Sequence, residues 1–111
     1  MRRLRIEFKR EARADLADIF RVVIGVSQDN SVAEGFIRRI IARCRRIGDA
    51  PRGGRPRDDL EAGLRTVPFE RSAVIAYRVE ADRVTITNVF YGGRDFEALF
   101  RSDPPDDAPP A

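Results

Sequence analysis

Histidine is absent from this sequence, and cysteine occurs once, at Cys44. Without histidine the chain lacks the commonest general base, the usual nucleophilic triads and the histidine-containing zinc sites. A single cysteine excludes a disulfide within the chain. Cys44 falls in a helical apolar pattern and is interpreted as a small buried side chain. The sequence therefore predicts no metal, no cofactor and no imidazole chemistry.

Long apolar runs are also absent, so no segment is expected to cross a membrane. The N-terminal stretch from Arg3 to Phe8 alternates charged and apolar residues, whereas a signal peptide requires a continuous apolar region. We therefore expect a cytoplasmic protein. The 111 residues suffice for one domain, which we expect over residues 1–100.

Lysine is nearly absent, since Lys9 is the only lysine among 21 basic residues. Arginine binds phosphate and carboxylate groups in a planar, bidentate manner. The formal net charge is +3, but residues 101–111 contain one arginine and three aspartates, which leaves +5 on residues 1–100. The Pro- and Asp-rich segment 101–111 has no apolar anchor and is expected to be a flexible tail.

The apolar spacing predicts a strand at the N-terminus, followed by two helices. Residues 3–8 alternate as a half-buried strand does. From about Lys9 the period becomes helical, and the spacing of Ser31 and Glu34 predicts a capping box at the start of a second helix that ends near Gly48. The expected apolar face of the first helix is formed by Ala12, Leu16, Ile19 and Val23.

The second half of the chain predicts an irregular loop over 51–63 and then three consecutive strands, over 64–68, 72–79 and 84–91. In the last strand Val84, Ile86, Asn88 and Phe90 are expected on one face and Thr85, Thr87, Val89 and Tyr91 on the other. A short terminal helix is expected within 94–100. The fold class is therefore α+β, with an N-terminal strand, an antiparallel helical hairpin and a three-stranded antiparallel meander forming one sheet.

Three stretches together resemble one protein family. They are 12–19, ARADLADI; 51–65, PRGGRPRDDLEAGLR; and 74–95, with VIAYRV and VTITNVFY leading to GGRD. Their order and spacing resemble the ParE/RelE superfamily of toxins from type II toxin–antitoxin systems. The resemblance covers residues 9–100, essentially the whole expected domain.

Two activities are known on the fold that this resemblance implies. RelE-type members cleave messenger RNA on the ribosome with basic residues and commonly a tyrosine near the C-terminus, whereas ParE-type members inhibit DNA gyrase. Arg65 and Arg94 match basic positions of the RelE type, but Phe100 stands where the tyrosine is expected, and Val74 where an arginine often stands. A phenyl ring stacks but transfers no proton. The resemblance is therefore closer to ParE.

This resemblance implies a growth-inhibiting toxin that binds gyrase, serves plasmid or chromosome maintenance, and is neutralised in a hetero-oligomer by a ParD-like antitoxin. Two alternatives stay open: a RelE-like, ribosome-dependent endonuclease, and a non-toxic basic domain that binds nucleic acid or its antitoxin. No catalytic residue is predicted. An enzymatic activity is the less favoured interpretation.

Candidate contact residues follow from charge, aromatic character and the resemblance. The target- or phosphate-facing candidates are Arg55, Arg57, Arg65, Arg94, Tyr77 and Tyr91. The candidates for antitoxin binding are Phe69, Phe96, Leu99 and Phe100, since exposed apolar surface marks partner sites. For each arginine a structural ion pair or a solvated surface is the alternative.

Eight arginines lie between Arg38 and Arg57, where the chain also carries the carboxylate of Asp49. They predict a surface for an acidic partner, namely gyrase, nucleic acid or an acidic stretch of antitoxin. Asp15 and Asp18 are expected on the outer face of the first helix, where they would support solubility.

Overall fold

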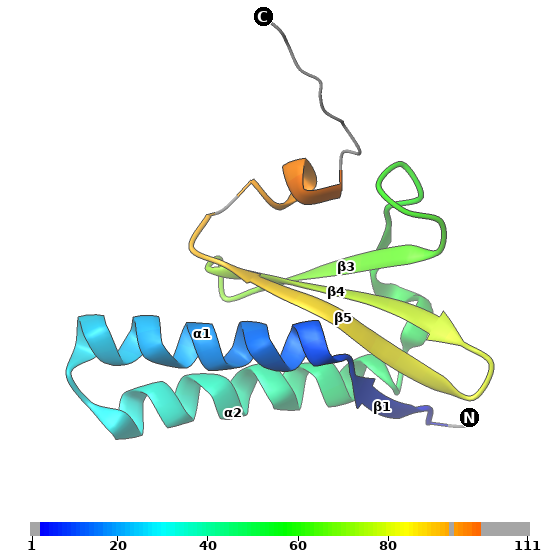
Figure 1. The fold of residues 1–111 in the computed structure, drawn as a ribbon. Coiled ribbons are helices and arrows are strands. Elements are labelled where there is room, and N and C mark those ends of the chain that lie inside the picture. The colour runs from blue at the N-terminus through cyan, green and yellow to red at the C-terminus, as the bar shows by residue number, and fades with distance from the viewer. Residues whose placement is uncertain (1–2, 94, 101–111) are drawn as a thin grey trace, which may run out of the picture.

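The computed structural model describes residues 3–93 and 95–100, so the predicted tail at 101–111 lies outside the described residues. Two helices cover one face of a five-stranded sheet, and a short 3-10 helix lies over the other face (Figure 1). The elements in chain order are β1 (Arg5–Phe8), α1 (Arg10–Ser27), α2 (Asn30–Ile47), η1 (Pro51–Gly53), β2 (Arg55–Pro56), β3 (Leu64–Phe69), β4 (Ala73–Glu80), β5 (Arg83–Tyr91) and η2 (Phe96–Phe100).

The sheet has the order β1-β5-β4-β3-β2. The antiparallel meander of β3, β4 and β5 confirms the predicted fold class. Two features were not predicted. The N-terminal strand pairs with β5 in parallel, and the two-residue strand β2 forms inside the segment expected to be irregular, against Arg65 and Thr66 of β3.

The helical hairpin packs on the sheet through the predicted apolar faces. Ala12 and Ile19 of α1 are buried, and Leu16 and Val23 pack beside them. In α2 the buried side chains are Ala33, Phe36, Ile40, Cys44 and Ile47. None of the helices in the described ranges is both long and apolar enough to span a bilayer.

The predicted cap of α2 was wrong by two residues. Asp29, not Ser31, is the N-cap residue, with extended backbone at φ −144°. Its carboxylate accepts hydrogen bonds from the backbone N–H and the hydroxyl of Ser31, each at 2.8 Å. An aspartate before the first turn satisfies the free N–H groups as well as serine does, and its charge also favours the helix dipole.

A β-bulge in β5 overturns the predicted alternation of its two faces. Tyr77 of β4 pairs with Ile86 whereas Ala76 pairs with Asn88, so Thr87 is an extra residue opposite this step. One extra residue reverses the side on which all later side chains lie. Val89 therefore joins Ile86 in the core on the helix side, and Phe90 faces the opposite side.

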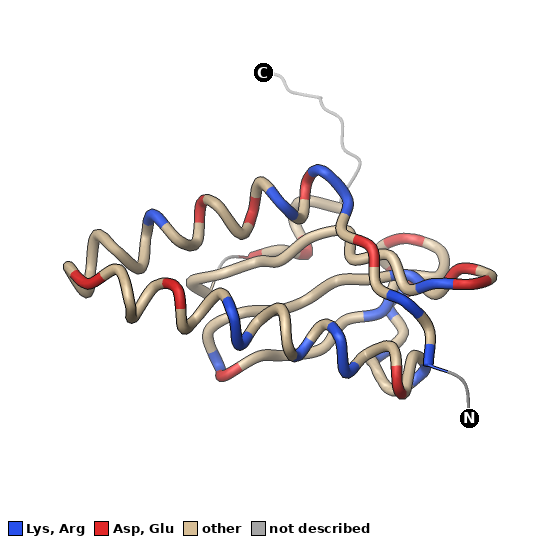
Figure 2. The backbone as a smooth tube through the Cα atoms, turned by 90° about the horizontal axis from the view of Figure 1, so that it is seen from below, with Lys and Arg blue, Asp and Glu red and all other residues tan. Residues whose placement is uncertain are grey.

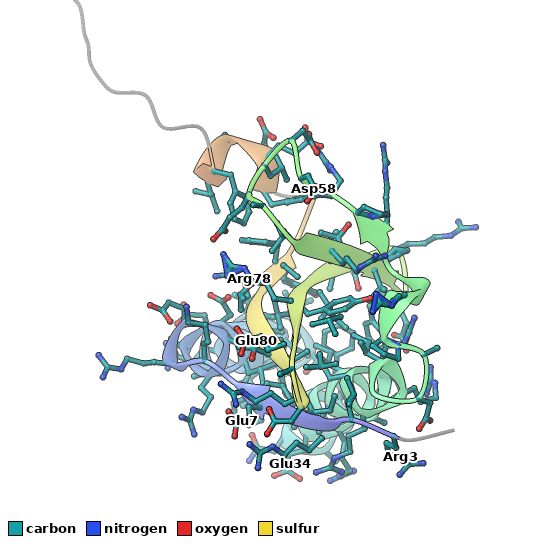
Figure 3. The ribbon with its side chains drawn as sticks, turned by 90° about the vertical axis from the view of Figure 1, so that its right-hand side faces the viewer. Arg3, Glu7, Glu34, Asp58, Arg78 and Glu80 are labelled. Atoms are coloured by element: carbon teal, nitrogen blue, oxygen red, sulfur yellow. The ribbon has the colours of Figure 1, made fainter. Side chains whose placement is uncertain are left out.

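The face of the sheet opposite the helices carries a second, smaller apolar cluster. Its buried members are Leu64, Ala76 and Phe90. The partly buried side chains that cover them are Leu60, Val74, Phe96 and Phe100. Figure 3 shows Asp58 in the loop beside η2, on the side of the sheet away from the helices. The loop and η2 thus cover the apolar cluster on the second face of the sheet.

Candidate functional site

The segment from η1 to β2 brings several of the predicted site residues together at one edge of the sheet. Tyr77 is fully buried, and its hydroxyl donates to the carbonyl of Pro51 at 2.8 Å and accepts from the N–H of Gly54 at 2.9 Å. Burial raises the pKa of this phenol. A side chain at Gly54 would overlap the Tyr77 ring, so a glycine is required there for the close approach.

Arg65 lies beside Tyr77 and is held by the same segment. Its Nη1 donates to the carbonyl of Arg52 at 3.0 Å and to the carbonyl of Gly54 at 2.9 Å. Arg55 of β2 is exposed and pairs with Thr66 in the sheet register, one position from Arg65. The edge therefore presents Arg55 in the open and Arg65 in a fixed, half-buried orientation.

Arg57 lies in a different environment. Its side chain is 9% exposed and is held by Asp59 at 2.8 Å and Glu97 at 2.9 Å. The hydrogen bond with Asp59 has the largest effect on the guanidinium, and together with the hydrogen bond to Glu97 it raises the pKa of Arg57 further above its usual range. The guanidinium also lies 6.0 Å from the ring centroid of Phe96. Arg57 thus fastens η2 to the loop after β2, which fits the structural alternative.

The aromatic candidates divide between the core and the second face. Phe69 is buried in the core, with its ring centroid 5.8 Å from that of Phe36, so a partner does not reach it in this conformation. Phe96 stacks on Phe90 at 5.2 Å, and Phe100 meets the same ring edge-on at 6.1 Å. Leu99, which is 59% exposed, is the accessible member of this group.

Tyr91 and Arg94 complete the predicted set. The half-buried ring of Tyr91 meets Phe36 edge-on at 5.6 Å and borders a groove between α1 and β5. It lies at the opposite end of the meander from Arg65, because Tyr91 pairs with Ala73 whereas Arg65 pairs with Tyr77. Arg94 lies outside the described residues.

The predicted outer position of Asp15 was wrong, and an exposed apolar surface was not predicted. The carboxylate of Asp15 accepts from the backbone N–H of Val89 at 2.9 Å, so this residue faces the sheet. Val22, Val26 and Val32 are 49%, 82% and 49% exposed at the tip of the helical hairpin. In the sequence, these three valines lie outside the predicted apolar face of their helices, and this position indicates that they are exposed.

The chemistry open to this site is recognition of anions by fixed guanidinium groups. Arg55 and Arg65 supply charge at an accessible edge, while the nearby Tyr77 hydroxyl is fully used in holding the loop. Among residues 3–93 and 95–100, no three His, Cys, Asp or Glu side chains gather as metal ligands do.

The family model described as the ParE toxin of the type II toxin–antitoxin system parDE matches residues 6–96. The chain belongs to the ParE toxin family. This match confirms the predicted family and the prediction that the chain is closer to ParE than to RelE. The protein is therefore a toxin component whose partner is an antitoxin. The matched range begins at the second residue of β1 and ends at the first residue of η2, so it contains all the elements between them.

Comparison with solved structures finds a chain of the same fold. A chain of the chromosomal ParDE TA system from P. aeruginosa has a TM-score of 0.69 and 21% identity, over 80% of this chain and 96% of that chain. The conserved hypothetical protein HP0894 from Helicobacter pylori gives a TM-score of 0.39 and 12% identity, over 79% and 93% of the two chains. No curated protein matches the ParE-family chain significantly.

Proposed function

We propose that this ParE-family chain is a growth-inhibiting cytoplasmic toxin that blocks DNA gyrase by binding it, and that a ParD-like antitoxin neutralises it. The observation that carries the proposal is the match of the ParE toxin family over residues 6–96. Gyrase is the target that the resemblance to ParE-type toxins implies.

The state of three side chains supports binding over RNA cleavage. Cleavage without a metal needs a base for the ribose hydroxyl, an acid for the leaving oxygen and cations at the phosphate. Tyr77 is buried with its hydroxyl engaged, and Phe100 has no hydroxyl. Arg57 is neutralised by two carboxylates. The edge keeps its cations, but neither the engaged hydroxyl of Tyr77 nor the ring of Phe100 transfers a proton there.

The exposed apolar surface supports a protein partner. A groove beside η2 is lined by Pro68, Val74, Phe90 and Phe96, and the exposed Leu99 belongs to the same short helix. Apolar grooves of this kind accept a helix or strand of a partner chain. We propose that the antitoxin covers Leu99 and this groove. Phe69, which is buried in the core, is not part of this contact.

Gyrase inhibition is tested with the purified full chain in a supercoiling assay on relaxed plasmid. The expected result is loss of supercoiling at micromolar toxin, with relaxation by topoisomerase I unaffected. The second reaction controls for a protein that merely coats DNA. Normal supercoiling in a micromolar excess of folded toxin contradicts the proposal.

The RelE-like alternative is kept because Arg55 and Arg65 are suited to contact phosphate. It is distinguished by mapping transcript ends after induction of the chain in growing cells. Our proposal expects no new ends inside translated codons. New ends at codon positions, together with uninhibited gyrase, would support ribosome-dependent cleavage instead.

A further inference from the structure

The arginines of this molecule fall into two groups. Of the 17 arginines in the described ranges, eight form ion pairs with described carboxylates, such as Arg39 with Glu70 and Arg57 with Asp59, and nine do not. Five of these nine gather at the sheet edge and on the side of α2 that faces it: Arg43, Arg46, Arg52, Arg55 and Arg65. We call these five the arginine edge.

The helical members of the arginine edge face the sheet edge. Arg39, Arg43 and Arg46 are spaced four and three residues apart, which places them on one side of α2. Arg39 donates to Glu70 in the turn between β3 and β4, at 2.8 and 3.0 Å, so this side of α2 looks toward β3. Figure 2 shows the basic residues along the second half of α2.

The loop members are joined to the same place by hydrogen bonds. Arg65 donates to the carbonyls of Arg52 and Gly54, and Arg43 and Arg65 are both close enough to Tyr77 to lower its pKa against the larger effect of burial. Turn hydrogen bonds from Gly48 to Gly53 connect the end of α2 to η1 without a long linker. The arginine edge is therefore continuous over α2, η1, β2 and β3.

The composition of the arginine edge indicates its partner. Between residues 43 and 57 the only carboxylate is Asp49, which Arg3 binds at 2.6 Å. The large exposed apolar side chains of the described residues lie elsewhere, three at the hairpin tip and one on η2. Protein interfaces are enriched in buried aromatic anchors, which this edge lacks among the described residues, whereas binding of a nucleic-acid backbone is mainly electrostatic.

We propose that the arginine edge binds the sugar–phosphate backbone of duplex DNA, while the apolar surfaces are left to protein partners. Guanidinium groups match phosphate oxygens in bidentate contacts. Single-stranded nucleic acids are bound by stacking on exposed aromatic rings, but the ring beside the arginine edge, Tyr77, is fully buried. This inference goes beyond the proposed function, because it does not depend on the identity of the protein target.

The proposal predicts a specific dependence on salt. Five arginine–phosphate contacts give a slope of log K against log salt of about −4.5, so that raising salt fourfold weakens binding several-hundred-fold. Replacing two arginines reduces the slope to about −2.7. Because backbone contacts carry little base information, two duplexes of unrelated sequence should bind with equal affinity.

The test measures fluorescence anisotropy of a labelled duplex of about 20 base pairs with the purified full chain over a salt series. The variant Arg52→Gln/Arg55→Gln removes two exposed cations whose side chains form no hydrogen bond within the described residues, so the fold should persist. Arg21→Gln/Arg38→Gln is the matched control. It removes the same net charge at exposed ion pairs along the helices, outside the arginine edge.

The proposal expects the first variant to lose about two units of slope and the control to keep the wild-type slope to within one unit. Equal losses in both variants would mean binding by net charge alone and would overturn the assignment. Tighter binding of an oligoglutamate peptide than of duplex DNA, abolished by Arg52→Gln/Arg55→Gln, would assign the surface to an acidic protein. Tighter binding of an RNA duplex or a single strand would also contradict the proposal.

Discussion

The edge of the sheet depends on one group of a single residue, the hydroxyl of Tyr77. It was predicted as a target-facing group, but it lies inside the protein and satisfies one donor and one acceptor of the η1–β2 segment. A buried polar group without a partner is costly, so this hydroxyl keeps the loop closed over the ring. Tyr77 thereby holds the backbone of the segment that carries Arg52 and Arg55.

Replacing Tyr77 by phenylalanine should lower the free energy of unfolding by about 1–3 kcal/mol, because Gly54 N–H and Pro51 C=O lose their partner. Urea unfolding measures this loss. Tyr91→Phe is the control, since the Tyr91 hydroxyl forms no hydrogen bond within the described residues and its ring packs on Phe36. Equal stability of the Tyr77→Phe and Tyr91→Phe variants would show that the hydroxyl does not hold the loop.

Cys44 provides a second prediction at this scale. Its side chain is fully buried, and burial raises the pKa of the thiol from 9.0 to about 12. The unfolded thiol ionises first as pH rises, so the stabilisation is present below about pH 9 and is lost toward pH 12. The native protein should not react with a disulfide reagent such as DTNB at pH 8, and one equivalent should react in denaturant. Rapid reaction of the native protein would contradict the burial.

At the scale of elements, Asp15 joins α1 to β5 where the sheet is interrupted. The strand β1 ends at Phe8, opposite Ile86, so the part of β5 after the bulge lacks this neighbour. Asp15 takes the place of a strand by accepting from the N–H of Val89 at 2.9 Å and from the amide of Asn88 at 3.3 Å. A helix carboxylate thus completes the sheet hydrogen bonding.

The variant Asp15→Ala should destabilise the protein by about 1–3 kcal/mol, because the backbone N–H of Val89 is left without an acceptor. Asp15→Asn keeps an acceptor oxygen and should lose less. The matched control is Asp18→Ala, one turn along α1, whose exposed carboxylate pairs with Arg21 on the same helix. Thermal or urea unfolding compares the three. A loss in Asp18→Ala as large as in Asp15→Ala would contradict this role.

The elements themselves follow closely from apolar periodicity. Both helices, the three strands of the meander and the short terminal helix occur within a few residues of their predicted bounds. Periodicity does not predict contacts that depend on distant segments. The bulge at Thr87, the strand β2 and the orientation of Asp15 each require the position of a partner element, so local sequence was insufficient for them.

The candidate site was predicted in composition but not in orientation. Arg55 and Arg65 lie at one edge of the sheet, where their contact with a target stays a prediction, whereas Arg57 is bound to Glu97, forty residues later in the chain. Phe69 was expected to be exposed, but a strand residue shows its face only when the sheet register is known. Burial and ion pairing are tertiary properties, and the sequence carries only the residue types.

At the scale of the whole molecule, charge and apolar surface are separated. The arginine edge lies at one end of the helical hairpin, the exposed valines lie at its other end, and Leu99 lies on the second face of the sheet. Such a division suits a toxin that contacts an antitoxin and a target through different surfaces. The proposed action of this ParE-family toxin is therefore through contact surfaces.

The most direct test of an antitoxin-controlled toxin is growth after induced expression of the chain, alone and together with a cognate ParD-like antitoxin. We predict arrest of growth when the chain is expressed alone, and normal growth when the ParD-like antitoxin is co-expressed. Unimpeded growth of cells in which the folded, full-length chain accumulates alone would contradict the account.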